Sequence, residues 1–358
     1  MNFGLEYLKN MIFQLQKGRP RGVSRVWANL LPHLKNILQG KHELVLLQRQ
    51  NSDLTNYGIE TFSIPSYNIG AREKDAKMLT SACKKLKIDL FITTYQTRVN
   101  GIKSLTFVYD LIPEILGWLP KSVEGVSRKE AYASSDILAC ISKNTKKDLH
   151  SWYDMSSKRV ELVYLGASAK DFHPLVSCEN AGFMEKYLLK PNYFILDGAI
   201  FPKDAEIFCR AFSSLNTDFS LFSYGGAVKK DVATSCSKYK IPYRQVGFLS
   251  GKEVLDALAG SKGLIFLSAN EGFGLPVLEA MACKIPVLCS RMTSLPEVGG
   301  DSVHYFTDHT YEGIRKGLVP FFNNEERNQF VEKAYTRSQE FTWIKAAEKL
   351  VKIILAGI

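Results

Sequence analysis

Short, continuously apolar runs rich in β-branched residues recur along this chain between longer amphipathic stretches. The runs are ELVLLQR, DLFITT, SLTFVYD, DILACIS and VELVYLG in the first half, and YFILDG, FSLFSYGG, GLIFLSA and IPVLCS in the second. Such runs are typical of parallel strands that are buried on both faces and joined by crossover helices. Nine of them are more than one ordinary sheet holds. The pattern therefore predicts an α/β protein with two doubly wound, Rossmann-like domains.

The strand pattern stops between residues 168 and 192, where Pro174, Gly182 and Pro191 punctuate the sequence. Proline and glycine at this density are typical of connecting segments. We therefore expect a linker in this stretch.

The domain boundaries follow from that linker. We predict an N-terminal domain of residues 1–175 and a C-terminal domain of residues 176–342. The tail from Glu325 to Ile358 predicts two helices, the last of which, about 343–358, would pack back on the first domain. Because ligands of doubly wound sheets bind at the carboxyl ends of the strands, we expect a site in a cleft between the domains.

Composition indicates a folded protein that works in solution or on a surface. The chain has 358 residues, of which 46% are apolar and 23% charged, as in ordinary globular proteins. Its seven cysteines form no CxxC pair, which favours reduced thiols over disulfides or a zinc site. We expect no signal peptide, because charges interrupt the N-terminal apolar residues. No apolar run approaches the roughly 20 residues of a membrane span, so we expect a cytoplasmic protein.

The net charge of +10 would favour phosphates, nucleic acid or an anionic lipid surface. The lysines and arginines are dispersed, however, and their densest groups are not interleaved with aromatic residues as in single-strand binders. We therefore do not expect nucleic acid as a partner. Most of the charge is interpreted as solvated surface, and peripheral binding to the anionic inner face of the membrane stays open as an alternative.

The segment GLIFLSANEGFGLPVLEAMACKIPVLCS reads as a buried strand, a glycine-rich turn, a helix and another buried strand. Pro276 suits the first turn of a helix, where an amide is unpaired in any case. Gly272 and Gly274 allow the backbone to approach a ligand closely. The free amides of a helix N-terminus bind anions, so this turn is a candidate diphosphate site.

Two carboxylates bracket that turn. Glu271 precedes it, and Glu279 lies about one helical turn inside the helix, where they could accept hydrogen bonds from sugar and ribose hydroxyls respectively. Taken singly, Glu271 could be a carboxylate that the helix dipole stabilises, and Glu279 could be part of a solvated helix face. Their joint occurrence around EGFGLP between two buried strands favours a ligand site.

This segment, from Ser268 to Glu297, resembles the signature of the family-4 retaining glycosyltransferases of the GT-B fold, in which seven residues separate two glutamates. The resemblance continues through Pro286-Val287 and Ser294-Leu295-Pro296-Glu297-Val298. It implies transfer of a sugar from a nucleotide-sugar donor to a saccharide or lipid-linked acceptor, with retention of anomeric configuration. The chain is similar in particular to bacterial rhamnosyl- and mannosyltransferase-like members, which act in polysaccharide or glycoconjugate assembly.

Weaker patches extend the resemblance over nearly the whole chain. They are Gly22-Val23-Ser24-Arg25, like the family's glycine loop; the segment from Val108 to Glu114; CISKNTKKDL from Cys140 to Leu149; Val246-Gly247-Phe248-Leu249, like a loop that contacts the base; and Phe341-Thr342-Trp343. In this resemblance the first domain faces the acceptor and the second binds the donor.

The chain departs from the family pattern at three positions. Tyr109 stands where the family usually has histidine, so no role of an imidazole carries over. Lys143 replaces a glutamate. After the first strand of the second domain Lys203 takes the place of the family's lysine, but Ile200 lies near the usual arginine.

Residues and resemblance together predict the site. The catalytic candidates are Lys203, as the cation that stabilises the leaving diphosphate, with Glu271 and Asp110. Lys203 could also be a solvated loop lysine, and Asp110 a helix cap or turn residue. The donor-binding candidates are Gly22, Gly198, Lys203, Phe248, Gly272, Phe273, Gly274, Leu275 and Glu279. The acceptor-side candidates are Arg25, Tyr109 and Ser142.

We expect neither a metal nor a resident cofactor. No aspartate is followed by another two positions later, so the DxD metal clamp of the other major transferase fold is absent, and the six histidines are scattered. The nucleotide sugar would be a co-substrate, and its base, guanine, uracil or thymine (GDP-, UDP- or dTDP-linked), stays open.

Two other classes compete with the enzyme. One is a catalytically lapsed nucleotide-sugar-binding protein of the same fold, which the changes at Tyr109, Ile200 and Pro202 would allow. The other is an oxidoreductase, which would want GxGxxG after its first strand. The chain offers GRPRGVSR there, so the oxidoreductase has the least support.

Overall fold

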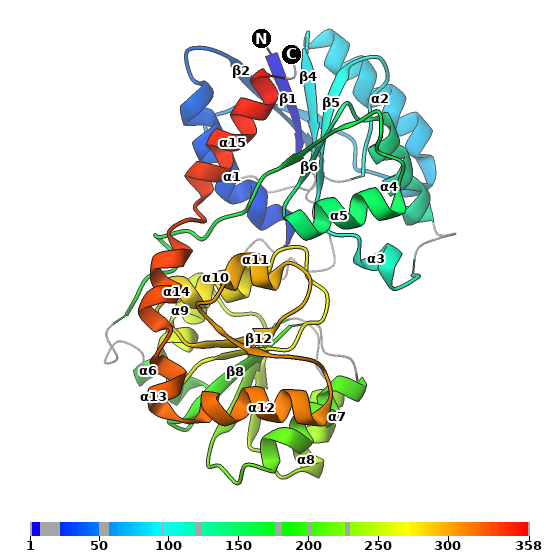
Figure 1. The fold of residues 1–358 in the computed structure, drawn as a ribbon. Coiled ribbons are helices and arrows are strands. Elements are labelled where there is room, and N and C mark those ends of the chain that lie inside the picture. The colour runs from blue at the N-terminus through cyan, green and yellow to red at the C-terminus, as the bar shows by residue number, and fades with distance from the viewer. Residues whose placement is uncertain are drawn as a thin grey trace. The chain divides into compact units, whose positions relative to one another are not determined.

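The computed structural model describes residues 2–7, 22–49, 57–94, 96–118, 123–175, 181–198, 202–225 and 230–356. These residues form two compact units. The first unit contains the described residues up to Leu165 together with the C-terminal segment that begins at Trp343, and the second unit contains Gly166–Thr342. Figure 1 shows the elements of both units.

The first unit is built on a parallel sheet in the order β3-β2-β1-β4-β5-β6-β7. Its strands are β1 (Asn2–Tyr7), β2 (Glu43–Arg49), β3 (Glu60–Ile64), β4 (Leu90–Thr93), β5 (Lys103–Val108), β6 (Ile137–Cys140) and β7 (Arg159–Leu162). Its helices are α1 (Val23–Leu38), the 3₁₀ turn η1 (Ile69–Ala71), α2 (Arg72–Lys85), α3 (Ile112–Ile115), α4 (Val123–Ser134), α5 (Lys143–Trp152) and α15 (Trp343–Leu355). The strand order reverses between β1 and β4, which is the switch point of a doubly wound sheet.

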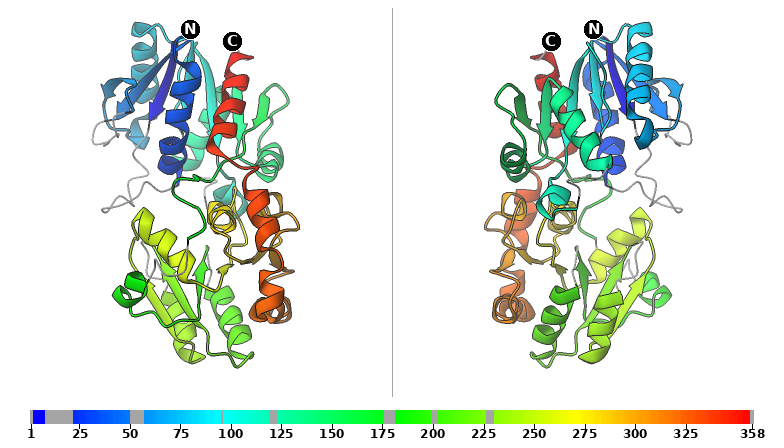
Figure 2. Two further views of the ribbon diagram at one scale, coloured as in Figure 1. Left: turned by 90° about the vertical axis from the view of Figure 1, so that its left-hand side faces the viewer. Right: turned by 90° about the vertical axis from the view of Figure 1, so that its right-hand side faces the viewer.

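Helices cover both faces of this first sheet (Figures 1 and 2). α1 and α15 pack together on one face, and α2 and α4 lie on the other. The apolar stripe of α1 includes the fully buried Trp27 and Leu30. The C-terminal helix is also tied to β7, where Arg159 Nη1 donates to the carbonyl of Ile353 (3.5 Å) and Lys349 lies 4.0 Å from Glu161.

The second unit has a parallel sheet in the order β10-β9-β8-β11-β12-β13, the Rossmann-type order 3-2-1-4-5-6. Its strands are β8 (Tyr193–Asp197), β9 (Ser220–Tyr224), β10 (Tyr243–Val246), β11 (Leu264–Phe266), β12 (Val287–Ser290) and β13 (His304–Phe306). Its helices are α6 (Ala181–Lys186), α7 (Pro202–Ser213), α8 (Lys230–Lys238), α9 (Gly251–Gly260), α10 (Leu275–Ala282), α11 (Leu295–Gly299), α12 (Tyr311–Phe322), α13 (Asn324–Asn328) and α14 (Val331–Ser338).

The core of the second unit is aromatic on one face of the sheet. α7, α8 and α12 cover this face (Figure 1), and Phe194, Phe208 and Phe321 are fully buried beneath them. Phe194 stacks on Phe322 with ring centroids 5.4 Å apart. Burying an aromatic side chain contributes about 1.5–3 kcal/mol, so this layer fixes the strands whose carboxyl ends carry the candidate site.

Each of the nine predicted runs contains a strand, so the expected pair of doubly wound α/β sheets is confirmed. β1, β3, β10 and β13 are not among the predicted runs. β3, β10 and β13 are edge strands. Ile64 is the one buried residue of β3, and β10 has none. Half-exposed edge strands lack a continuous apolar run, which explains why β3 and β10 were missed; β13 is only three residues long, His304–Phe306.

The structure differs from the sequence prediction at the linker and in the tail. The boundary between the units falls after Leu165 rather than near residue 175. Part of the expected linker is the helix α6. Lys186 and Tyr187 attach it to α9 by hydrogen bonds to Glu253, in the first turn of that helix (2.6 and 2.8 Å). The tail from Glu325 onward passes through α13, α14 and α15 instead of two helices.

The described cysteines are free thiols. Cys209 of α7 and Cys236 of α8 lie with their sulfur atoms 3.6 Å apart in the core. Burial raises the pKa of the Cys283 thiol to about 12, so this side chain packs as a small apolar group.

Candidate active site

The site in the second unit starts where the sheet order reverses, between β8 and β11. The amide of Leu267, just after β11, donates to the carbonyl of Asp197 at the end of β8 (3.0 Å). Gly198 follows with φ +105°, and a Cβ there would lie 2.7 Å from the amide nitrogen of Ser268. Only glycine fits this position, because both the backbone angle and the space exclude a side chain. The two loops therefore touch at the switch point, where doubly wound sheets bind ligands.

The turn after β11 carries Glu271, and hydroxyl groups hold it. Ser268 Oγ donates to the carbonyl of Asn270 (3.1 Å), and Ser290 Oγ, at the end of β12, donates to the carbonyl of Ser268 (2.7 Å). The amide of Glu271 donates to Thr293 Oγ1 (3.1 Å), and Ser294 Oγ donates to the Glu271 carbonyl (2.8 Å). The turn after β12 thus fixes both backbone polar groups of Glu271.

The helix α10 begins at a glycine for two physical reasons. Gly274 is its N-cap in the left-handed region (φ 96°, ψ 48°), and a Cβ there would lie 2.5 Å from Leu295 Cδ2. Pro276 occupies the first turn, and no acidic residue does. Glycine has no side chain that could bond to the first-turn amides of α10. These amides lie at the helix N-terminus, the end that stabilises an anion.

Glu279 is buried in α10, with 4% of its surface exposed. The alternative that it belongs to a solvated helix face is therefore wrong. A carboxylate is rarely buried unless it is paired or binds something, and this burial is the strongest sign that α10 does more than pack. Phe273, also predicted to bind the donor, is 2% exposed and packs edge-on against Phe341 (5.9 Å between centroids). Its side chain belongs to the core, so its contribution to a ligand would come from the backbone.

Lys203 lies in the first turn of α7, directly after the Gly198 loop, and its side chain is exposed. Phe248 follows β10 and is half-buried, in a loop whose Gly247 carbonyl accepts from the amide of Gly225 after β9 (3.1 Å). Ile200, near the place of the family's arginine, lies outside the described residues.

In the first unit, Gly22 is the exposed N-cap of α1, with φ +54°. Its carbonyl accepts from the amides of Arg25 (3.1 Å) and Val26 (3.3 Å). Arg25 is half-buried in the first turn, and its carbonyl accepts from Asn29 Nδ2 (2.9 Å). Both residues therefore sit at the start of a 16-residue helix, the end that favours anions.

Tyr109 follows β5, and a tryptophan orients it. The indole Nε1 of Trp27 donates to the Tyr109 hydroxyl at 2.7 Å. Phe107 packs against both rings, 4.9 Å from Trp27 and 6.0 Å from Tyr109 between centroids. Since the indole is a donor only, the Tyr109 oxygen is the acceptor in this bond. The sequence analysis missed Trp27, whose pairing joins residues 82 positions apart.

Asp110 is a turn residue, as one of the two interpretations of the sequence had it. Its Oδ1 accepts from the amide of Ile112 (3.1 Å). Burial raises the pKa of Asp110, and the nearby Arg128 guanidinium opposes that rise. Arg128 also donates to the Asp110 carbonyl and forms a buried ion pair with Glu114 (2.9 Å). Glu114 accepts from the Tyr153 hydroxyl as well (2.9 Å), so a charged cluster fixes the turn.

Ser142 is the N-cap of α5 and is fully buried. Its hydroxyl oxygen accepts from the amide of Thr145 (3.0 Å) and donates to Thr145 Oγ1 (2.9 Å). Thr145 Oγ1 in turn donates to the Tyr109 carbonyl (3.4 Å). These bonds give Ser142 a structural role beside Tyr109, and its contact with an acceptor stays a prediction.

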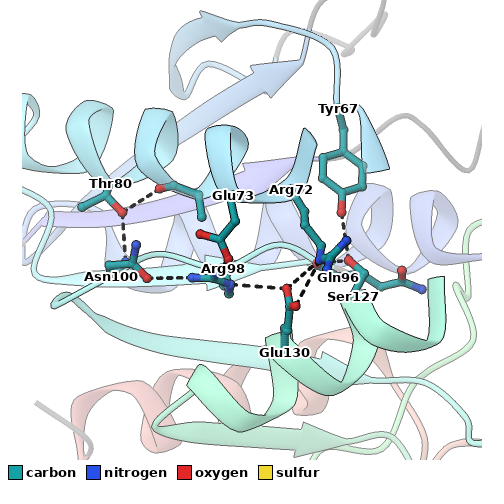
Figure 3. Close-up of polar contacts among 10 residues, drawn as sticks. Tyr67, Arg72, Glu73, Thr80, Gln96, Arg98, Asn100, Ser127 and Glu130 are labelled. Carbon is teal, nitrogen blue, oxygen red and sulfur yellow. Dashed lines mark hydrogen bonds and ion pairs between the residues drawn. The ribbon is translucent and has the colours of Figure 1, made fainter. Parts of the chain in front are cut away.

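A polar network holds the loop after β4 between α2 and α4 (Figure 3). Arg72 Nε donates to Glu130 (3.0 Å), and Arg98 bridges Glu130, Glu73 and Asn100. Figure 3 also shows Ser127 between the hydroxyl of Tyr67 (2.9 Å) and the carbonyl of Gln96 (3.1 Å). Gln96 Nε2 donates to Glu124 (3.2 Å). Polar groups of α2 and α4 therefore fix the loop that follows β4.

The predicted site residues divide between the units. The second unit brings the Gly198 loop, the Glu271 turn and the start of α10 together at one sheet edge, and the first unit places Tyr109, Asp110 and Ser142 at the ends of β5 and β6. In the described parts of the chain, no group of three histidine, cysteine, aspartate or glutamate side chains could hold a metal ion. The cleft between the domains and metal-independent chemistry stay predictions.

The second unit is similar to a known protein family. Residues 183–337 match the family model described as glycosyl transferases group 1. A serotype-specific mannosyltransferase, WbdA of Escherichia coli, is 28% identical over 231 residues, which are 60% of this chain and 28% of that protein. The chain thus spans less than a third of the length of such mannosyltransferase relatives.

A second relative matches along its whole length. The N-acetylgalactosamine-N,N'-diacetylbacillosaminyl-diphospho-undecaprenol 4-alpha-N-acetylgalactosaminyltransferase of Campylobacter jejuni is 25% identical over 386 aligned positions, covering 98% of this chain and 100% of that protein. Among solved structures, HepE of Anabaena in complex with UDP-glucose has a TM-score of 0.73 at 12% identity, over 99% of this chain and 100% of that one. The GT-B fold and the similarity to family-4 glycosyltransferases are thereby confirmed.

Proposed function

We propose that this chain, which has the GT-B fold and is similar to family-4 glycosyltransferases, moves a sugar from a nucleotide-sugar donor to a saccharide or lipid-linked acceptor. The transfer retains the anomeric configuration and serves polysaccharide or glycoconjugate assembly. One observation carries the proposal. The buried carboxylate of Glu279 lies in a helix that begins at a glycine cap, beside the turn of Glu271, at the edge where β8 and β11 end. This combination suits a ligand with an anionic centre and hydroxyl groups on both sides.

The donor is held by hydrogen bonds of complementary type. Glu279 accepts from the ribose hydroxyls, and Glu271 accepts from hydroxyls of the transferred sugar. The amides from Gly272 to Leu275 bind the sugar oxygens and the β-phosphate, because a helix N-terminus stabilises negative charge. Gly198 keeps the neighbouring loop close enough to form the other wall of this site.

Lys203 supplies the positive charge that the reaction needs. Negative charge develops on the diphosphate as the bond to the sugar breaks, and a cation placed beside it stabilises the transition state. The exposed ammonium at the first turn of α7 is the candidate. With retention, the leaving phosphate accepts the acceptor's proton, so no protein base is assigned and no metal is required.

The acceptor is bound by the first unit in this proposal. Gly22 and Arg25 lie at the N-terminus of α1, and Tyr109 and Asp110 present polar groups at the end of β5. The Campylobacter relative is named for a diphospho-undecaprenol-linked saccharide acceptor, which supports a lipid-linked acceptor here.

The base of the donor is left open among guanine, uracil and thymine. HepE, which shares the fold, was solved with UDP-glucose, and this supports a nucleotide-sugar donor. A thermal-shift screen with GDP, UDP, dTDP and their sugars tests the choice, because a ligand at 100 times its Kd stabilises the folded protein by about 2.7 kcal/mol. We expect one base to raise the melting temperature and the other two to leave it unchanged.

Lys203→Ala tests the chemistry. We expect a larger fall in kcat than rise in KM for the donor, since the ammonium acts on charge that develops in the transition state. Lys230→Ala is the matched control, because Lys230 is an exposed lysine at the start of the neighbouring helix α8. Equal kinetics for both variants would remove Lys203 from the mechanism. Donor binding without turnover with any acceptor would favour the lapsed nucleotide-binding protein.

We place the chain in the cytoplasm, with peripheral binding at the inner membrane face. No helix of the described residues has the length and apolarity to cross a bilayer. The first unit exposes Trp118 (61%) and Trp152 (50%), and tryptophan prefers membrane interfaces. Together with the net charge of +10, this supports binding to anionic lipid. Sedimentation with anionic vesicles should show binding that falls with salt and weakens in Trp118→Ala, and salt-independent or absent binding would overturn it.

A further inference from the structure

The turn after β12 holds the Glu271 turn through two consecutive side chains. Thr293 Oγ1 accepts a hydrogen bond from the Glu271 amide, and Ser294 Oγ donates one to the Glu271 carbonyl. Thr293 is half-buried and Ser294 is fully buried. Two backbone features accompany these bonds. Thr293 has a left-handed backbone conformation, and Ser294 makes no cap bond to its own helix.

Thr293 adopts a backbone conformation that threonine avoids. Its φ is +51°, in the left-handed region where glycine or asparagine is the usual occupant and where a β-branched residue is an outlier. Strained residues of this kind persist where the surroundings hold them, and they are concentrated at functional sites. Glycine would relieve the strain at this position, but it would lose the hydroxyl that receives the Glu271 amide.

Ser294 is the N-cap of α11, yet it does not cap that helix. Serine is favoured at N-caps because its hydroxyl accepts an amide of the first turn. Here α11 has no side-chain cap bond, and the hydroxyl donates to Glu271 instead (2.8 Å). By contrast, Ser142 and Ser250 cap α5 and α9 in the ordinary way.

The contact continues one residue further along the chain. Leu295 lies against Gly274, where a Cβ would come within 2.5 Å of its Cδ2. Three consecutive residues, Thr293, Ser294 and Leu295, therefore fix the Glu271 turn at both ends, at Glu271 itself and at the cap of α10.

We infer that Thr293 and Ser294 are positioning residues for sugar transfer, which hold the Glu271 backbone so that its carboxylate and the following amides converge on the sugar. This inference rests on the proposed role of Glu271 as a sugar ligand. Both residues act through Glu271 and neither needs to touch the donor. Loss of such support can misplace a reacting group, and a displacement of about 1 Å costs about 100-fold in rate.

Thr293→Gly separates positioning from stability. Replacing threonine by glycine relieves the left-handed strain, so we expect no loss of melting temperature, whereas kcat/KM for the nucleotide sugar should fall by about 10- to 100-fold. Affinity for the nucleoside diphosphate alone should stay unchanged, because it lacks the sugar that Glu271 binds. Thr293→Ser keeps the hydroxyl and should retain most of the activity.

Lys240→Gly is the matched control for the glycine substitution. Lys240 has φ +57° and is an exposed residue of the second unit, in the turn after α8. It undergoes the same change in backbone freedom without contact to the Glu271 turn, so we expect its melting temperature to follow that of Thr293→Gly while kcat/KM stays at the wild-type value. A Thr293→Gly variant with wild-type kcat/KM would overturn the inference, as would a fall in activity that only follows the loss of folded protein.

Hydrogen exchange tests the contact without any donor. In the full chain, the amide of Glu271 should exchange faster in Thr293→Gly than in the wild type and stay protected in Thr293→Ser. If exchange changes as expected but the wild type transfers no sugar from any donor, the proposed function fails while the contact stands. If Glu271 exchanges equally in all three proteins, the positioning role fails whatever the activity.

Discussion

Two turns at the carboxyl ends of strands, one in each unit, are held by different chemistry. The Glu271 turn after β11 is fixed by neutral hydroxyls that bond to its backbone, from Ser290, Thr293 and Ser294. The turn of Asp110 after β5 is fixed by charge, through the buried Arg128 and Glu114. Hydroxyl bonds do not titrate in the physiological range, whereas a buried carboxylate and guanidinium depend on each other's charge.

The difference implies that the two turns fail in different ways. A lost hydroxyl in the second unit removes one modest bond and lets a short turn shift. A lost partner in the first unit leaves a buried charge without compensation. We therefore expect changes at the Glu271 turn to act mainly on activity, and changes around Asp110 to act mainly on stability and on its pH dependence.

The largest effect is expected for Arg128→Ala. This change leaves Glu114, 7% exposed, without its ion pair, and breaking a buried pair in this way costs about 3–5 kcal/mol. All four tryptophans lie in the first unit, so tryptophan fluorescence during urea unfolding reports on that unit. We expect its midpoint to fall sharply.

The double variant Arg128→Met/Glu114→Met is the control for that loss. Replacing both charges by apolar groups removes the unpaired carboxylate, so the double variant should recover much of the stability. A single variant as stable as the wild type would show that the charged cluster does not hold the turn.

Gly198→Ala should have the next largest effect, and in the other unit. The new methyl group would lie 2.7 Å from the amide nitrogen of Ser268 at a φ of +105°, and forcing such a conformation costs about 1–3 kcal/mol. Hydrogen exchange should rise around β8 and β11 while the tryptophan midpoint stays the same. Gly182→Ala is the control, because a Cβ there meets no atom within 4 Å in α6. Equal exchange in both variants would mean that the two loops are not in tight contact.

Asp110→Asn should change how stability depends on pH. Burial raises the pKa of Asp110 in the folded protein above its ordinary 3.8. Between the pKa of the unfolded chain and that of the folded protein, the folded protein therefore holds a proton that the unfolded chain has lost. The free energy of unfolding therefore falls as pH rises through this window. Asparagine keeps an oxygen for the Ile112 amide and cannot ionise, so the variant should lose this decline. An unchanged pH profile would contradict the assignment.

Glu253→Gln should give the smallest effect, and the difference from the wild type should be present above pH 4.5 and vanish in acid. A hydrogen bond from Lys186 is the main cause that lowers the pKa of Glu253 from 4.5 to about 2. The unfolded chain therefore takes up the proton first, and this carboxylate stabilises the fold above pH 4.5 and ceases to as pH falls toward 2. The gain is small because Lys186 is 60% exposed. Hydrogen exchange of α6 at pH 6 and pH 3 should differ less in the variant than in the wild type.

The sequence predicts the sheets well because buried parallel strands leave continuous apolar runs. It also places Gly198, Glu271 and Asp110 at strand ends, since Gly198 and Asp110 are the last residues of such runs and Glu271 lies two positions after one. It does not predict the bonds that hold these residues. Trp27 meets Tyr109 across 82 positions and Thr293 meets Glu271 across 22, and no local pattern marks such pairs. The strained φ of Thr293 and the missing cap bond of Ser294 exist only in the folded chain.

The most direct measurement is calorimetric titration of the full chain with GDP-, UDP- and dTDP-sugars, in the wild type and in Glu279→Gln. We expect one donor to bind, and the variant to bind it about tenfold or more weakly, because a hydrogen bond to a charged group contributes about 1.5–3 kcal/mol. Its tryptophan unfolding midpoint should match the wild type, since Glu279 lies in the second unit. Absence of binding to every donor, or equal binding by both proteins, would contradict the assignment of this site to a nucleotide sugar.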